Sequence, residues 1–346
     1  MIKQENYLLD NIKRIQKESK SDPIIIERVL FAFGLLEALC KVELPFVFKG
    51  GTSLLLLLNK PKRLSTDIDI IVNPGIDIDD YLKKAEVIFP FKYKEEQIRK
   101  GKNAIEKRHF KFYYDSPSMN KEFHIILDVV FAKAPYTEVV ERKIDNSLLI
   151  TEEPNVSVLL PSVDCILGDK LCAFAPKTTG VLYGQDKELE IIKQMYDVST
   201  LIDQVDNFET VKDTYKTSVE AESAFRGESF TVIDCLQDTI ETCLTIISKG
   251  KIGSEHHKEL LNGIKKIRSH IFQVQYSAEV AAEDACKVLY FAACLLKNKP
   301  FTKIVDGEQY KEPSELNKEL SKGSYMRKRN LIAYGYLVEA NTLLFD

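Results

Sequence analysis

Apolar residues recur near the helical period at the start of the chain and change to a strand-like pattern further on. Between residues 1 and 41 this periodicity predicts two helices, separated at Pro23. From residue 45 to about 150 the apolar residues fall in short β-rich runs, which include PFVFK, DIDIIV, KRHFKFYYD and FHIILDVVF. The first 150 residues therefore combine helices with a sheet.

Helical periodicity returns after Pro154 and Pro161 and continues through most of the remaining chain. The strongest predicted helix covers residues 277–298, with Ser277 as its N-cap. We therefore expect an α+β fold in two domains, with a mixed sheet and flanking helices at 1–155 and a helical domain at 156–346.

Charge and composition exclude several classes of protein. The 346 residues carry 48 Lys and Arg against 52 Asp and Glu, so the net charge of −4 argues against a protein that coats nucleic acid through bulk charge. The longest apolar run, residues 288–296, is far shorter than the roughly 20 residues of a membrane-spanning helix. We expect a cytoplasmic protein without a membrane partner, whose seven cysteines are reduced and buried.

Two aspartates alternate with apolar residues in the run STDIDIIV. Residues two apart on a strand point to one face, so Asp67 and Asp69 would lie side by side. Like charges this close repel unless a cation lies between them, and hard oxygen ligands suit Mg²⁺. Alone the pair is weak evidence, because an edge strand can simply turn its charges outward.

The preceding segment, FKGGTSLLL, predicts a strand that turns at Gly50 and Gly51 into an apolar helix, capped by Thr52 or Ser53. Glycines allow a close approach to an anion, and a helix N-terminus favours phosphate. The alternative is a tight turn without a ligand.

A third carboxylate, Asp128, lies in the very apolar run FHIILDVVF. A buried charge without a partner is unfavourable, so Asp128 requires a metal, a cation or a hydrogen-bonding cluster. If this strand lies beside that of Asp67 and Asp69, all three carboxylates converge on one metal site. Otherwise Asp128 faces solvent at a strand end.

Together, these motifs resemble the nucleotidyltransferase superfamily, and more narrowly the AbiEii/AbiGii toxin family of type IV toxin–antitoxin and abortive-infection systems. The resemblance implies Mg²⁺ ligands at Asp67, Asp69 and Asp128. It implies that nucleotide-binding residues lie in and after the glycine turn, at Lys49, Gly50, Gly51, Thr52, Ser53, Arg63 and Ser65.

The resemblance extends to a lysine and an aspartate in the helical part. In the family these residues face the nucleotide pocket, and Lys170 and Asp197 stand in their places here. The stretch KQMYD departs from the family pattern, in which many relatives have a basic residue immediately before the aspartate. Without the family, Lys170 would be interpreted as a solvated helix lysine.

The function implied is a Mg²⁺-dependent transfer of a nucleoside monophosphate from an NTP to an acceptor hydroxyl at an RNA end, such as that of tRNA. The family also implies a cognate antitoxin that acts on gene expression rather than by direct binding. Two alternatives are a small-molecule nucleotidyltransferase of the antibiotic-modifying type and a catalytically idle nucleotide-binding protein.

Residues 92–111 are a candidate RNA surface, because they carry eight Lys or Arg against three Glu. Tyr93, His109 and Phe110 are interleaved with these charges, as in proteins that stack unpaired bases. The alternative is a solvated hairpin whose aromatic side chains pack inward.

Overall fold

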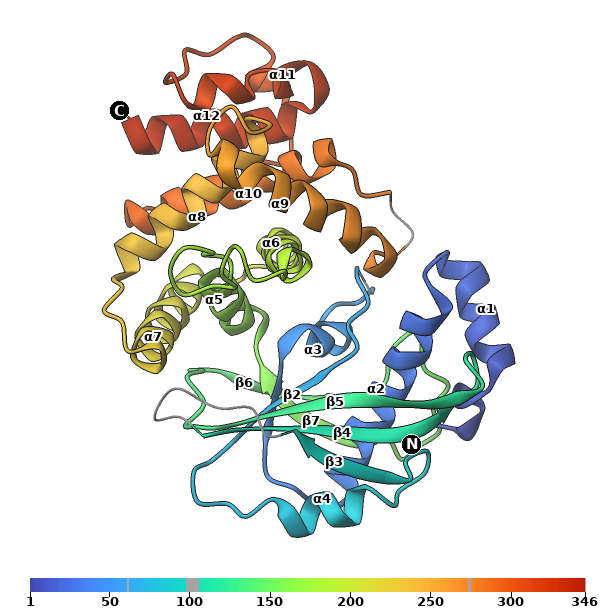
Figure 1. The fold of residues 1–346 in the computed structure, drawn as a ribbon. Coiled ribbons are helices and arrows are strands. Elements are labelled where there is room, and N and C mark those ends of the chain that lie inside the picture. The colour runs from blue at the N-terminus through green and yellow to red at the C-terminus, as the bar shows by residue number, and fades with distance from the viewer. Residues whose placement is uncertain (61, 98–105, 273–274, 346) are drawn as a thin grey trace. The chain divides into compact units, whose positions relative to one another are not determined.

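The computed structural model describes residues 1–60, 62–97, 106–272 and 275–345, and Figure 1 shows the ribbon. The contacts divide the chain into two compact units. The first comprises Met1–Ser162 and a short segment that starts at Ser269, and the second comprises Val163–Arg268 and the chain from Gln275 onward. The domain limits expected from the sequence, 1–155 and 156–346, stay a prediction.

The first unit is built on a five-stranded mixed sheet in the order β1-β2-β5-β4-β3. Among the strands of the described residues, β2 and β5 pair in parallel, and the other neighbours in this sheet are antiparallel. The strands are β1 (Val47–Lys49), β2 (Ile68–Val72), β3 (Tyr93–Gln97), β4 (Lys107–Ser116) and β5 (Lys121–Phe131). A separate hairpin pairs β6 (Val139–Lys143) with β7 (Ser157–Pro161). The predicted α+β fold with a mixed sheet is confirmed.

Helices accompany this sheet, and they are α1 (Leu9–Ser19), α2 (Pro23–Lys41), α3 (Gly50–Leu57) and α4 (Asp79–Ala85). The N-terminal pattern predicted the first two and the glycine turn predicted α3, whereas α4 was not predicted from the sequence. The helix α2 begins at Pro23, and the Asp22 side chain accepts hydrogen bonds from the backbone N–H groups of Ile24 and Ile25. Its Phe31 ring stacks on Tyr114 of β4 at 3.7 Å, so α2 covers one face of the sheet.

Burial alternates along β5 in the way that a strand with one covered face requires. Ile125, Leu127 and Val129 are fully buried, whereas the residues between them are half-buried. The half-buried side carries Asp128 and, on the neighbouring strands, Asp69, His109, Lys111 and Tyr113. We call this side the open face of the sheet.

The second unit is helical, as expected. Its helices are α5 (Val163–Ala173), α6 (Glu188–Ile202), α7 (Phe208–Arg226), α8 (Val232–Ile247), α9 (Ser254–Lys266), α10 (Ala278–Leu296), α11 (Met326–Arg329) and α12 (Leu331–Phe345). Ser277 caps α10 by accepting a hydrogen bond from the N–H of Val280. Six of the seven cysteines are buried and Cys40 is half-buried.

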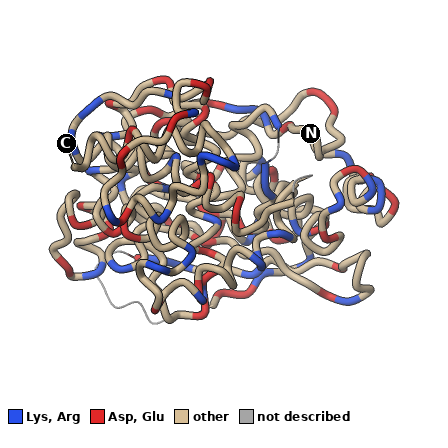
Figure 2. Tube along the Cα trace, turned by 90° about the horizontal axis from the view of Figure 1, so that it is seen from above, with Lys and Arg blue, Asp and Glu red and all other residues tan. Residues whose placement is uncertain are grey.

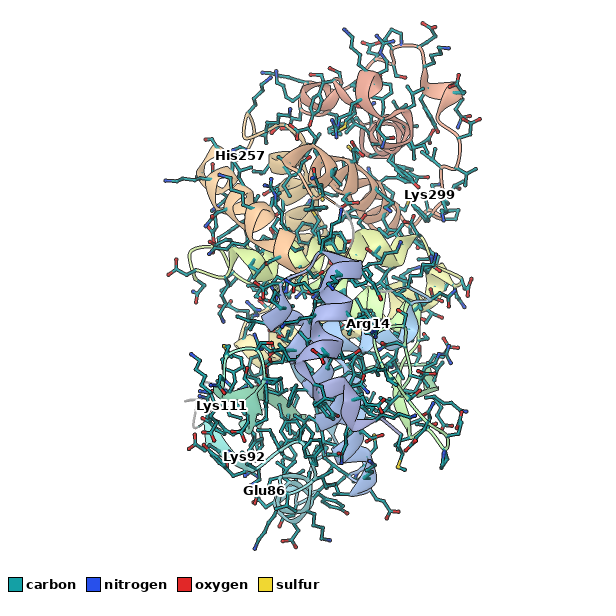
Figure 3. All side chains as sticks on the ribbon, turned by 90° about the vertical axis from the view of Figure 1, so that its right-hand side faces the viewer. Arg14, Glu86, Lys92, Lys111, His257 and Lys299 are labelled. Carbon is teal, nitrogen blue, oxygen red and sulfur yellow. The ribbon has the colours of Figure 1, made fainter. Side chains whose placement is uncertain are left out.

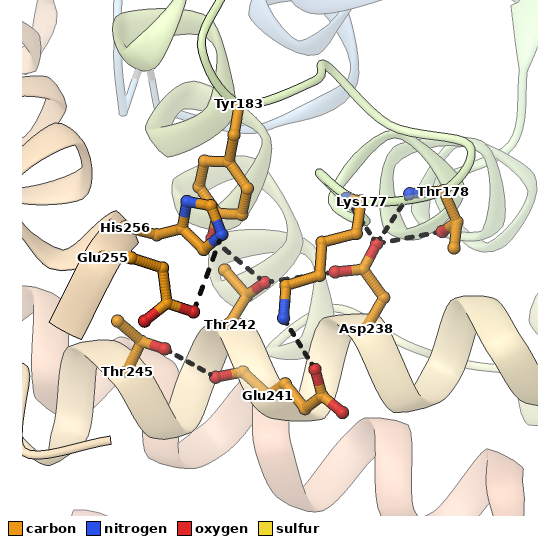
Figure 4. A network of polar contacts seen from close by, with 9 residues as sticks. All are labelled: Lys177, Thr178, Tyr183, Asp238, Glu241, Thr242, Thr245, Glu255 and His256. Carbon is orange, nitrogen blue, oxygen red and sulfur yellow. Dashed lines mark hydrogen bonds and ion pairs between the residues drawn. The ribbon is translucent and has the colours of Figure 1, made fainter. Parts of the chain in front are cut away.

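A buried carboxylate fixes the loop between α5 and α6. Asp238 of α8 accepts hydrogen bonds from the backbone N–H groups of Lys177 and Thr178, at 2.7 and 3.0 Å, and from the Thr178 hydroxyl (Figure 4). Burial raises the pKa of Asp238. These bonds satisfy loop N–H groups that would otherwise be buried without partners.

Charge is distributed without a single dominant sign. Acidic and basic residues are interspersed along the described chain (Figure 2). In the same residues, no helix has the length and apolar character needed to cross a membrane.

Candidate functional site

The turn from β1 into α3 requires a glycine at its first position. Gly50 has a φ of +78°, in the left-handed region that favours glycine. A Cβ atom added at Gly50 would also collide with Oδ2 of Asp69. The backbone of the turn therefore lies directly against the carboxylate that follows it by nineteen residues in the sequence.

The second glycine of the turn contacts the other predicted nucleotide-binding residues. A Cβ atom at Gly51 would lie 2.6 Å from Nη2 of Arg63 and 2.7 Å from Oγ of Ser65. Arg63 is buried and Ser65 is half-buried. The structure thus brings Gly50, Gly51, Arg63, Ser65 and Asp69 together, and their roles in binding a nucleotide and a metal stay a prediction.

The expected helix cap is wrong. The helix α3 begins at Gly50, and Lys49 occupies the N-cap position without a side-chain cap. Thr52 and Ser53 lie inside the helix, fully buried. The Thr52 hydroxyl donates to the backbone oxygen of Asp67 at 2.6 Å, and the Ser53 hydroxyl donates to that of Gly50 at 2.8 Å. The Thr52 hydroxyl thus connects the helix to the residue that precedes β2, and the Ser53 hydroxyl bonds within the turn itself. Nucleotide binding by either residue stays a prediction.

Strand register aligns the carboxylates. Asp69 and Asp128 are direct partners in the parallel pair of β2 and β5, where neighbouring strands lie about 4.8 Å apart. Lys49 is the partner of Asp69 on β1, and His109 is the partner of Asp128 on β4. A row of Lys49, Asp69, Asp128 and His109 therefore crosses the open face. The condition stated from the sequence, that the strand of Asp128 lies beside that of Asp69, is met, and Asp128 does not lie at a strand end.

Asp67 precedes β2 rather than lying within it. Its Oδ1 atom lies 3.1 Å from Nη2 of Arg28, a residue of α2. The Arg28 guanidinium also lies 5.7 Å from the ring centre of Phe123. Sequence reasoning did not identify Arg28, because its pairing with Asp67 depends on how α2 packs.

His109 was predicted only as part of a basic stretch, but it contacts the third carboxylate. Its Nδ1 atom lies 2.5 Å from Oδ1 of Asp128. The side chain of His109 is 15% exposed and that of Asp128 is 31% exposed. Asp128 therefore has the hydrogen-bonding partner that its apolar surroundings required. The alternation in KRHFKFYYD could have indicated that His109 lies on the polar face.

Two of the three predicted carboxylates, those of Asp69 and Asp128, are placed as neighbouring ligands of a divalent cation. Asp69 and Asp128 present neighbouring hard oxygen ligands, which suit Mg²⁺. Within the described ranges, however, no group of three or more His, Cys, Asp or Glu side chains is arranged to hold a metal ion. A metal site that includes Asp67 as the third ligand stays a prediction.

The two predicted residues of the helical unit pair with each other. Nζ of Lys170 on α5 lies 3.0 Å from Oδ2 of Asp197 on α6, and also donates to Oε1 of Gln194. The side chains of Lys170 and Asp197 are 8% and 2% exposed. The interpretation of Lys170 as a solvated helix lysine is therefore wrong, and contact of either residue with a nucleotide stays a prediction.

The candidate RNA stretch divides between the two faces of the sheet. Phe110 is buried on the face under α2, which rules it out as a stacking residue. Tyr93 is exposed and stacks on Tyr113 at 4.6 Å, and its hydroxyl donates to Glu122, which raises the pKa of Tyr93 to about 12. Lys111 is on the open face beside this pair of rings, and Figure 3 labels it. Residues 98–105, with Arg99, Lys100 and Lys102, are outside the described residues.

A comparison with protein families shows to which family this chain belongs. The family described as "Nucleotidyl transferase AbiEii toxin, Type IV TA system" matches residues 35–284, which span both the carboxylates and the Lys170–Asp197 pair. The chain belongs to the AbiEii nucleotidyltransferase toxin family. Family membership makes this protein a nucleotidyltransferase toxin, as the sequence resemblance predicted.

The AbiEii chain is also similar to two solved structures from Helicobacter pylori. One is JHP933, with 14% identity, a TM-score of 0.40, and coverage of 79% of this chain and 93% of that chain. The other is a protein assigned as a nucleotidyltransferase, with 15% identity, a TM-score of 0.42, and coverage of 79% and 96%. No curated protein matches this AbiEii sequence.

Proposed function

We propose that this toxin transfers a nucleoside monophosphate from an NTP to a hydroxyl at an RNA end, such as that of tRNA, with Mg²⁺ as cofactor. One observation carries the proposal. Asp69 and Asp128 are register partners on the open face, and the Gly50–Gly51 turn lies against Asp69. Phosphate-binding backbone and metal-binding carboxylates are the two parts that nucleotidyl transfer requires.

The residues of this chain would bind and orient both substrates. Backbone N–H groups at the start of α3 would receive the triphosphate, and Arg63 beside Gly51 would add a positive charge. The acceptor hydroxyl would attack the α-phosphorus in line, the bond to the bridging oxygen would break, and pyrophosphate would leave. Asp128 would help to activate that hydroxyl. Mg²⁺, held by Asp67, Asp69 and Asp128, would neutralise the triphosphate charge.

We propose RNA as the acceptor because of the residues on the open face of the sheet. Lys111 and the stacked rings of Tyr93 and Tyr113 lie on the same side of the sheet as Asp128. A cation beside aromatic rings suits an unpaired RNA end. For the physiological setting, we infer an antitoxin that counteracts the toxin through gene expression, without binding to it.

The experiment supplies the purified toxin with α-labelled NTPs, Mg²⁺ or EDTA, and either total RNA or a set of small hydroxyl compounds. We expect label in RNA, lost with EDTA and reduced by more than 100-fold in Asp69→Asn. Asp115→Asn is the matched control, because Asp115 is an exposed aspartate on β4 outside the row.

Transfer by Asp69→Asn at the rate of the unchanged protein would contradict the site. Label found only in small molecules would contradict the RNA acceptor while retaining the reaction. Expression of the toxin with and without a neighbouring antitoxin gene, followed by affinity purification, tests the inferred partner. Growth should recover without co-purification.

A further inference from the structure

We propose that His109 is a positioning residue for the nucleotidyl-transfer site, which holds the Asp128 carboxylate in the orientation that binds the divalent cation. This inference rests on the proposed function for the identity of the ligand. Its geometric basis is the 2.5 Å contact between Nδ1 of His109 and Oδ1 of Asp128.

The proposed role of Asp128 as a cation ligand determines the direction of this hydrogen bond. A carboxylate that binds a cation is ionised and can only accept, so in that state Nδ1 of His109 carries the hydrogen and donates it. Bonds to an ionised acceptor are about twice as strong as neutral ones. Because His109 is 15% exposed, solvent weakens this bond only slightly.

Repulsion between the two aspartates explains why Asp128 requires a fixed partner. Asp69 and Asp128 are direct neighbours on parallel strands, and their like charges favour turning one side chain away. A donor from β4 holds Asp128 from the opposite side to Asp69, because β5 lies between β2 and β4. The cation then meets a carboxylate that is already oriented.

The position of His109 is itself fixed by strand pairing. It is opposite Asp128 in the antiparallel pair of β4 and β5, and opposite Gln97 in the pair of β3 and β4. The flanking Phe110 is buried in the core on the opposite face of β4, which fixes the strand's rotation and therefore the side to which His109 points. The arrangement matches the general role of groups that orient metal ligands, whose removal weakens metal binding by about 10- to 100-fold.

Two amide substitutions separate a positioning role from a merely structural one. In His109→Asn the side-chain amide nitrogen occupies the place of Nδ1, whereas in His109→Gln it lies one bond further out, near the place of Nε2. Positioning through Nδ1 therefore predicts that Asn rescues function and Gln does not. His124→Ala is the matched control, because His124 is on the open face of the neighbouring strand and contacts the rings of Tyr113 and Phe123.

The primary readout is Mn²⁺ binding to the full chain by titration calorimetry, which does not depend on turnover. We expect His109→Ala to weaken Mn²⁺ binding by about 10- to 100-fold, His109→Asn to bind within about threefold of the unchanged protein, and His109→Gln to resemble the alanine variant. In transfer assays the loss should fall on kcat more than on KM for the NTP. His124→Ala should bind Mn²⁺ normally.

Equal Mn²⁺ affinity in His109→Ala and the unchanged protein would overturn the inference, as would equal affinity of the Asn and Gln variants. Absence of Mn²⁺ binding in the unchanged protein would also overturn it. The proposed function would fail separately, if no label reached any acceptor. In that case the His109 variants could still differ in Mn²⁺ affinity, so the two failures are distinguishable. If His109→Ala does not fold, the comparison of Asn with Gln decides the matter.

Discussion

Lys170 and Asp197 form an ion pair that is almost completely excluded from solvent. Removing one partner of such a pair leaves a buried charge and lowers stability by about 3–5 kcal/mol. We therefore expect Lys170→Met to lower the free energy of unfolding by that amount, measured by urea denaturation.

A matched control for this ion pair is Lys193→Met, since Lys193 pairs on the same helix α6 with Glu190, whose side chain is 44% exposed, and should change stability by less than about 1 kcal/mol. The double variant Lys170→Met, Asp197→Leu should be more stable than Lys170→Met alone. Equal stability of Lys170→Met and Lys193→Met would contradict the buried pair.

Alanine substitutions at Gly50 and Gly75 compare the effect of one added Cβ atom at two different sites. Both have a positive φ, but an added Cβ meets Asp69 at Gly50 and nothing within 4 Å at Gly75. Each alanine substitution should lower stability by about 1–2 kcal/mol through backbone strain. Only Gly50→Ala should also weaken Mn²⁺ binding, because it displaces Asp69. Calorimetric titration of both variants checks this, and equal Mn²⁺ affinities would contradict the close approach.

At the scale of elements, Glu188 joins the start of α6 to α9. Its carboxylate accepts a 2.7 Å hydrogen bond from Nζ of Lys266 and another from the Asn262 amide. The bond from Lys266 lowers the pKa of Glu188 below its usual value. The unfolded chain therefore binds a proton here at a higher pH than the folded chain does.

The sign of the pH dependence follows from this lowered pKa. Glu188 contributes stability above the pKa of an unfolded glutamate, about 4.3, and loses the contribution as the pH falls through its folded pKa. Glu188→Gln should therefore be less stable than the unchanged protein at pH 7, and the difference should shrink at pH 3. Urea midpoints at both pH values test this, with the exposed Glu209→Gln as control.

The sequence predicted those elements whose apolar pattern is strong. The runs that became β1, β2, β4 and β5 carry such a pattern, and so do the helices of the second unit. The edge strand β3, with the sequence YKEEQ, was anticipated only through the alternative of a hairpin at residues 92–111, because it is held by backbone pairing with β4 rather than by apolar burial. The glycine turn and the aspartates are local motifs, whereas the contacts of Arg28 and His109 depend on packing and register that no local pattern encodes.

At the scale of the whole molecule, the chain returns to the first unit after more than one hundred residues of helical unit. The N–H of Leu64 donates to the oxygen of His270, and the N–H of Phe272 donates to that of Lys62. Arg63, which lies against Gly51, faces Ile271 in this pairing. The segment that leads into the carboxylates thus receives its hydrogen-bonding partner from a remote part of the sequence.

A fragment that ends at residue 162 should therefore have an incomplete site. Without residues 269–272, the amide of Leu64 loses its hydrogen bond and should exchange with solvent at least tenfold faster than in the full chain. Hydrogen exchange followed by mass spectrometry measures this. Amides of β5, whose partners are all within the fragment, provide the internal reference, and equal protection of Leu64 in both chains would contradict the pairing.

This return of the chain also sets an order of events during synthesis. About 200 residues separate Leu64 from His270, and a ribosome that adds about 5–20 residues per second needs on the order of 10–40 s to make them. In the later part of that interval, once Asp128 has been made, the nascent chain contains the glycine turn and all three aspartates, but not the segment that pairs beside Arg63. A cell that translates this toxin therefore has a delay between making the glycine turn with its aspartates and completing this pairing, and a message cut short before residue 269 yields a chain without it.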